Sequence, residues 1–157
     1  MMKKGRMALL ALLLLLVSAG CAAAAAPGAV TPEGGEAPQT MLILTVDGTP
    51  LNVTWESNET VAALMEELQD GPVTITTHRY GGFEQVGSLP GPLPSDDVQT
   101  TTAPGDVVLY NDDSLVLFFG TNRWAYTRLG HIDDMDGGAL KELLGGETAE
   151  VMLALAE

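Results

Sequence analysis

The sequence predicts a mainly β protein with two short helices, folded as a closed or nearly closed barrel that the helices cap. Short apolar runs, several with alternating polar residues, recur between turn residues from residue 41 to residue 157, as in β-strands. Helical spacing occurs in only two stretches. Seven or eight strands would leave exposed edges in one open sheet of this size, and closing the barrel removes those edges.

The first elements are two strands and a helix. The run MLILTVDGTPLNVTWES predicts a hairpin that turns at Asp47-Gly48. Ser57 or Asn58 can cap a helix that stops at Asp70-Gly71-Pro72 and has one apolar face. The face consists of Val61, Leu64, Met65 and Leu68. This helix is expected to cover the barrel.

The remaining elements are mostly strands. VTITT, starting at Val73, predicts one strand, and residues 77–87 predict a polar loop with recognition potential. Residues 89–104 are rich in Pro, Ser, Asp and Thr, which indicates irregular surface chain. Strands are then expected in GDVVLY, SLVLFFG and WAYTRLGHI. A short helix near residues 139–144 and a strand near residues 148–155 complete the chain.

The N-terminus predicts export. Basic residues precede an apolar run from Met7 to Val17, and small residues lead to the chain's one cysteine, Cys21. Ser18-Ala19-Gly20-Cys21 resembles the cleavage box of a bacterial lipoprotein signal, although Ser18 stands where leucine is usual. The resemblance implies that residues 1–21 are a signal and that Cys21 carries lipid. Ordinary secretion and a retained membrane helix over residues 7–26 are the alternatives.

Residues 22–40 are expected to form a flexible tether, because they are rich in Ala, Pro and Gly and lack apolar periodicity. Residues 41–157 then form one domain. The whole chain has a net charge of −14, which becomes −17 once the three basic residues of the signal are removed. Such a charge repels phosphate backbones and anionic lipids, so we exclude nucleic acid as a partner and expect only a lipid to hold the membrane.

Two segments carry a family resemblance. PGDVVLYNDDSLVLFFG and YTRLGHIDD, together with the order of elements, resemble small bacterial domains of the cyclophilin-like fold, which are often exported and have no settled biochemical role. The resemblance covers nearly all of residues 41–157. It implies a cyclophilin-like barrel. The lipoprotein-type signal implies that this barrel lies outside the cytoplasm, anchored to the cell membrane as a lipoprotein.

The resemblance also implies candidate site residues. Cyclophilin isomerases have a His-Arg pair with a phenylalanine five residues after the arginine and a glutamine eight residues after it. Here Phe83 follows Arg79 by four residues and Gln85 follows it by six. Because alternate strand residues face opposite sides, this shortening can turn one group away from a pocket. The candidate ligand-binding residues are Arg79, Phe83, Gln85, Phe119, Trp124 and Tyr126, with Arg79 as the candidate catalytic donor.

The expected function is binding of a peptide or small ligand without efficient isomerase activity. The alternatives are an active peptidyl-prolyl isomerase for exported proteins and a structural module of the cell envelope. In the structural reading, the phenylalanines fill the core and Arg79 pairs with surface carboxylates. Nothing in the sequence supports a hydrolase. Residues 111–113 and 133–136 offer oxygen ligands without calcium-loop spacing, so we expect no metal and no cofactor.

Overall fold

Ten strands and two α-helices make up the part of the chain that the structure describes, residues 40–156 of a computed structural model. A 3-10 turn, η1 (Leu68–Asp70), follows the first helix. The helices are α1 (Glu59–Glu67) and α2 (Gly137–Leu144). The strands are β1 (Met41–Val46), β2 (Thr49–Leu51), β3 (Val53–Trp55), β4 (Val73–Tyr80), β5 (Glu84–Ser88), β6 (Val98–Thr101), β7 (Asp106–Tyr110), β8 (Ser114–Phe118), β9 (Arg123–Ile132) and β10 (Thr148–Ala156).

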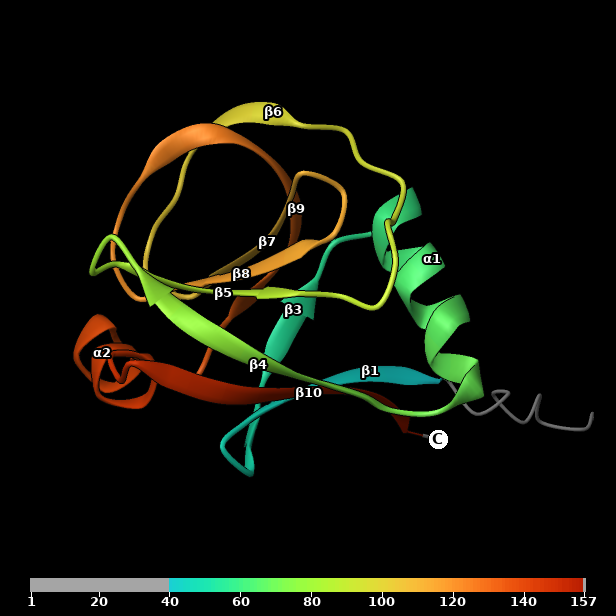
Figure 1. Ribbon diagram of the computed structural model, residues 1–157, viewed down its shortest axis with the longest axis horizontal. Coiled ribbons are helices and arrows are strands. Elements are labelled where there is room, and N and C mark those ends of the chain that lie inside the picture. The colour runs from blue at the N-terminus through green and yellow to red at the C-terminus, as the bar shows by residue number, and fades with distance from the viewer. Residues whose placement is uncertain (1–39, 157) are drawn as a thin grey trace, which may run out of the picture. The chain divides into compact units, whose positions relative to one another are not determined.

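The strands form one antiparallel sheet in the order β2-β1-β10-β4-β5-β8-β7-β9-β3, with β6 paired to β9 off this path. β2 and β3 are separated only by Asn52, yet β2 pairs with β1 and β3 pairs with β9. One short stretch of chain therefore joins the two ends of the strand order, and the sheet curls into a nearly closed barrel (Figure 1). This confirms the predicted fold class.

The main core fills the barrel, and both helices contribute to it. Leu44, Leu117 and Leu153 are among its fully buried strand residues. α1 buries Val61 and Leu64, whereas α2 buries Leu140 and Leu144. The helices lie at different places around the barrel (Figure 1). Capping fixes where each helix begins, because a side-chain oxygen accepts hydrogen bonds from N–H groups that would otherwise be unpaired. Asn58 supplies this oxygen for α1, and Asp136 supplies it for α2.

A second, smaller cluster lies on the other side of β7 and β8. Leu115 and Leu117 of β8 belong to the main core, whereas the alternate residues Val116 and Phe118 belong to this second cluster. The cluster also contains Val108, Tyr126 and, at its margin, Phe83, Val86 and Tyr110. The strands here are thus apolar on both faces, and the outer face carries the candidate site.

Two segments predicted to be irregular contain strands. Residues 77–87, predicted as a loop, form a hairpin in which β4 ends at Tyr80 and β5 begins at Glu84. Gly81 and Gly82 turn the chain between them with φ angles of 59° and 75°, which glycine adopts without steric cost. Residues 89–104 contain the short strand β6.

The predicted signal, Cys21 and all of the predicted tether except Thr40 lie outside the described residues. Within residues 40–156, no helix combines the length and apolar character needed to cross a bilayer.

Candidate ligand pocket

A pocket of about 390 Å³ opens on the outer face of the sheet, over the second cluster. Four of its lining residues are aromatic and come from three strands: Tyr80 (β4), Tyr110 (β7), and Trp124 and Tyr126 (β9). The rest of the lining consists of Glu84, Val86, Val116 and Asn122. The pocket is therefore an aromatic and aliphatic hollow with one acidic group.

Strand register brings these side chains together. Tyr80 pairs with Glu84 across the β4–β5 hairpin, and Glu84 pairs in turn with Phe118 of β8. Directly paired residues project from the same face of a sheet, so these three side chains form a row. On β9, Trp124 and Tyr126 are two residues apart and point to one side for the same reason.

The base of the pocket is held by aromatic packing. The Tyr126 ring meets Phe118 edge to face at a centroid distance of 5.6 Å and meets Tyr110 in the same way at 5.9 Å. Phe83 stacks on Phe118 at 6.4 Å. Asn122 Nδ2 donates a hydrogen bond of 2.8 Å to the Tyr126 hydroxyl. These contacts restrict the rings, so the pocket is formed before any ligand arrives.

Glu84 is the charged group of the site, and it is 5% exposed. Its Oε2 atom is buried and has no hydrogen-bond partner within residues 40–156. Burial raises the pKa of Glu84 from its ordinary 4.5 to about 7, because removing a carboxylate from water disfavours the charged form. Burial, and then the nearby charge of Glu84, also raise the pKa of Tyr126. Near neutral pH the site therefore exchanges between a carboxylate and a carboxylic acid.

The structure does not bring the six predicted site residues together. Trp124 and Tyr126 line the pocket, with Trp124 57% exposed at its edge. Phe83 packs against the second cluster through its stacking on Phe118 and does not line the pocket. Phe119 belongs to the main core on the opposite side of the sheet, because it alternates with Phe118 and so faces the other way.

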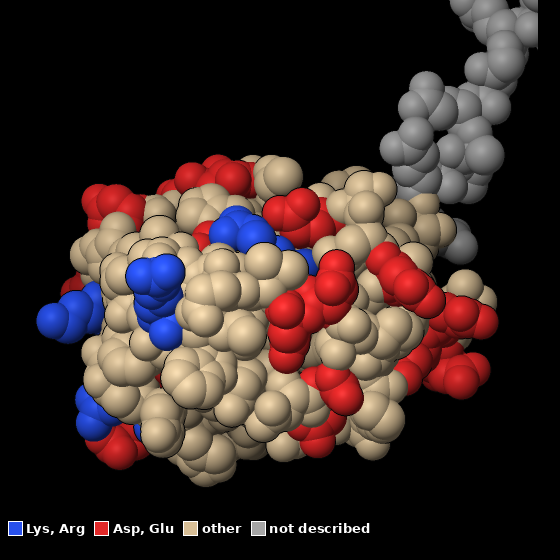
Figure 2. Space-filling view, turned by 90° about the horizontal axis from the view of Figure 1, so that it is seen from above, with Lys and Arg blue, Asp and Glu red and all other residues tan. Residues whose placement is uncertain are grey.

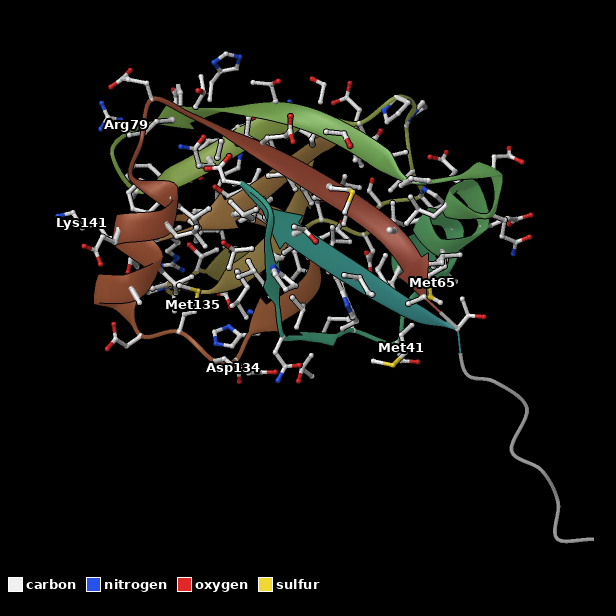
Figure 3. The ribbon with its side chains drawn as sticks, turned by 90° about the horizontal axis from the view of Figure 1, so that it is seen from below. Met41, Met65, Arg79, Asp134, Met135 and Lys141 are labelled. Atoms are coloured by element: carbon white, nitrogen blue, oxygen red, sulfur yellow. The ribbon has the colours of Figure 1, made fainter. Side chains whose placement is uncertain are left out.

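Arg79 and Gln85 pair across the hairpin and serve a different purpose. Both side chains donate hydrogen bonds at the end of α2 and in the turn that follows it. Arg79 donates to the Gly145 carbonyl at 3.0 Å and to the Glu147 carboxylate. Gln85 donates to the Leu144 and Gly146 carbonyls at 2.7 and 2.9 Å. Figure 3 shows Arg79 at this end of the molecule, beside the turn. The last carbonyls of a helix lack partners within the helix, and these donors satisfy them. Neither residue lines the pocket.

Glu84 is the site residue that sequence reasoning missed. It stands between Phe83 and Gln85, two predicted residues, in a segment interpreted as a loop. Interpreting that segment as a strand would have placed Glu84 on the face opposite to Gln85, in the middle of a sheet. A carboxylate at such a position is the signal that could have identified it.

A second buried carboxylate, Asp106, is fully partnered. Its Oδ1 atom lies 2.9 Å from His131 Nδ1 and accepts from Arg128 Nη2 at 3.2 Å, and its Oδ2 atom accepts from the Ala103 N–H. These contacts tie together β7, β9 and the loop before β7. Among residues 40–156, no three His, Cys, Asp or Glu side chains are placed to hold a metal ion together.

The nearly closed barrel and the two helices define a small β-barrel of the cyclophilin-like class. A family model described as the cyclophilin-like family matches residues 44–154. The chain belongs to this family. No curated protein matches the chain.

Proposed function

We propose that the protein is a membrane-tethered, extracytoplasmic cyclophilin-like domain that binds a peptide or small ligand in the aromatic pocket, without efficient isomerase activity. The lipoprotein-like box ending at Cys21 supports the tether and the location. The pocket supports the binding function, as argued below.

The observation that carries the binding proposal is the lining of the pocket. Ligand sites are typically concave, mostly apolar, and contain a few polar groups that orient the ligand. The pocket over the second cluster has that composition, with Glu84 and Asn122 as its polar members. Trp124 and Tyr80 are 57% and 68% exposed, and large exposed rings at a hollow offer contact area to a ligand.

The pocket lacks the group that prolyl isomerisation needs most. That reaction requires a cationic donor that binds the twisted amide better than the planar one. Among residues 40–156, no Lys, Arg or His lines the pocket, and the candidate donor, Arg79, is bound to Gly145 and Glu147. Both observations favour ligand binding over efficient isomerase activity.

Thermal unfolding of the full chain in a non-ionic detergent tests the proposal. The probes are tetrapeptides that vary one central residue through all amino acids. We expect some of them to raise the melting temperature, since a ligand that binds only the folded state stabilises it. The Trp124→Ala variant should lose the effect, and Met41→Ala, which removes an equally exposed side chain outside the pocket, should keep it.

The binding proposal would be contradicted if no tetrapeptide shifted the melting temperature, or if the Trp124→Ala variant responded like the wild type. The same preparation should not accelerate isomerisation of a proline tetrapeptide. A rate well above the uncatalysed one that fell on Arg79→Ala would overturn the second half of the proposal.

A further inference from the structure

We propose that the aromatic pocket takes a small organic cation, an ammonium group carried by a free molecule or by a peptide side chain, and that Glu84 pairs with it. This inference rests on the proposed binding function and names the class of ligand.

Glu84 Oε2 lacks a partner within residues 40–156, which favours a cationic ligand. A buried carboxylate without a counter-charge is costly, so buried acids in proteins are normally paired or hydrogen-bonded. Asp106, equally buried, follows this rule with Arg128 and His131. Glu84 does not, because no basic side chain lines its pocket and its Oε2 has no partner within residues 40–156. The balancing charge must be a proton or a cation from outside.

The aromatic side chains of the pocket favour the same class of ligand. Tyr80, Tyr110, Trp124 and Tyr126 supply four π systems around one carboxylate. The face of an aromatic ring carries partial negative charge and attracts ammonium groups, which are recognised in proteins by such cages. An apolar neutral ligand would use the rings but leave the carboxylate unpaired, and an anion would be repelled by it.

Size and charge agree with this class of ligand. A volume of about 390 Å³ suits a small molecule or one side chain. The chain beyond Cys21 has a net charge of −17, which concentrates cations around the protein. Figure 2 shows acidic side chains spread widely over one face of the molecule, with basic side chains gathered toward one end.

Protonation of Glu84 must be coupled to binding. A cation favours the carboxylate, so affinity should rise as the pH rises through about 7, the pKa of the empty site, and binding below that pH should release a proton. The titratable groups that face Glu84 are Tyr80 from β4, Tyr110 from β7 and Tyr126 from β9. His78 lies exposed on β4, two residues before Tyr80, and does not line the pocket.

Calorimetric titration of the full chain in non-ionic detergent, at about pH 8 where Glu84 is ionised, tests the inference. The first pair of probes is choline and its uncharged isostere, in which carbon replaces the nitrogen. The second pair is Nα-acetyl-lysine amide, whose side-chain ammonium is free, and Nα-acetyl-norleucine amide, which has no side-chain ammonium. Binding of choline alone would indicate a free molecule as the source of the cation, and binding of the lysine amide would indicate a peptide side chain.

We expect at least one charged probe to bind roughly tenfold or more tightly than its neutral partner, and Glu84→Gln to remove that preference. Glu142→Gln makes the same change at an exposed position of α2 and should have no effect. Trp124→Ala, a change at an exposed residue, should weaken binding while the protein stays folded.

Equal binding of charged and neutral probes, or a charge preference that survives in Glu84→Gln, would overturn the cation inference. If the neutral probes still lost affinity in Trp124→Ala, the pocket would remain the binding site of the proposed function. If none of the four probes bound, the cation inference would fail, and the tetrapeptide experiment alone would decide the fate of the binding function.

Discussion

Glu84 and Asp106 are both almost fully buried, at 5% and 4% exposure, yet within residues 40–156 Asp106 has hydrogen-bond partners and Glu84 Oε2 has none. Asp106 joins β7 to β9 and to the loop before β7 through its hydrogen bonds and so stabilises the barrel. Glu84 lines a hollow and contributes nothing comparable, which indicates that its burial serves the pocket rather than the fold. Buried carboxylates with raised pKa values gather at functional sites.

The raised pKa of Glu84 has a defined effect on stability. The folded state holds the proton up to about pH 7, whereas the unfolded chain releases it near 4.5. The protonated Glu84 therefore contributes its full stabilisation below pH 4.5. The free energy of unfolding then falls as the pH rises from 4.5 through about 7, where the folded state also loses the proton. A difference of this size corresponds to about 3 kcal/mol once both transitions are complete.

The β4–β5 hairpin is the element that connects the sheet to α2. Its Gln85 donates two hydrogen bonds to carbonyls at the end of α2, from a fully buried position. Arg79 donates to the same turn from a half-exposed position. These two of the six predicted site residues thus hold the turn that follows α2, and they differ in how much stability they supply.

Replacement of these two residues should separate their roles. Gln85→Leu should lower the free energy of unfolding by about 1–3 kcal/mol, because two carbonyls lose their donors in a buried place. Arg79→Ala should cost less than about 1 kcal/mol, as exposed ion pairs do. Urea unfolding of both variants measures this. Equal losses, or a larger loss for Arg79→Ala, would contradict this division.

The sequence predicted most elements, but it did not predict which side of the sheet each side chain lies on. Residues 84–88 were missed as a strand because the buried positions of β5 are Glu84, Gln85 and Gly87, which produce no apolar alternation. Phe119 was placed in the site because β8 is apolar on both faces, and an apolar run does not indicate which residue faces which side. Of the six predicted site residues, Trp124 and Tyr126 line the pocket and the other four do not.

The fold as a whole could be predicted because short apolar runs between turn residues are typical of a mainly β chain. Closing the sheet into a barrel removes its exposed edges, which favours a barrel over an open sheet. What could not be predicted was how the barrel closes. That depends on β2 and β3, two short strands on either side of Asn52, which join opposite ends of the sheet. Residues so far apart in the sheet leave no local signal of their pairing.

The proposed tether predicts the location of the whole molecule in a bacterial host. The wild type should incorporate labelled fatty acid and be shortened by removal of the signal, whereas Cys21→Ala should incorporate none and keep its full length, since lipidation and cleavage at the lipoprotein box both require the cysteine. Fatty-acid labelling with electrophoresis of the membrane fraction measures this. A wild-type protein that stays in the membrane fraction at full length without label would instead favour an uncleaved apolar helix over residues 7–26.

The central claim is that Glu84, whose buried Oε2 atom has no partner within residues 40–156, pairs with a cation that enters the pocket. The most direct measurement compares urea unfolding of the full chain with that of Glu84→Gln between about pH 4.5 and 8, without and with choline. We predict that the wild type loses about 3 kcal/mol relative to the variant over this range, and that choline restores part of the loss in the wild type alone. Parallel pH profiles of the two proteins, unchanged by choline, would contradict the claim.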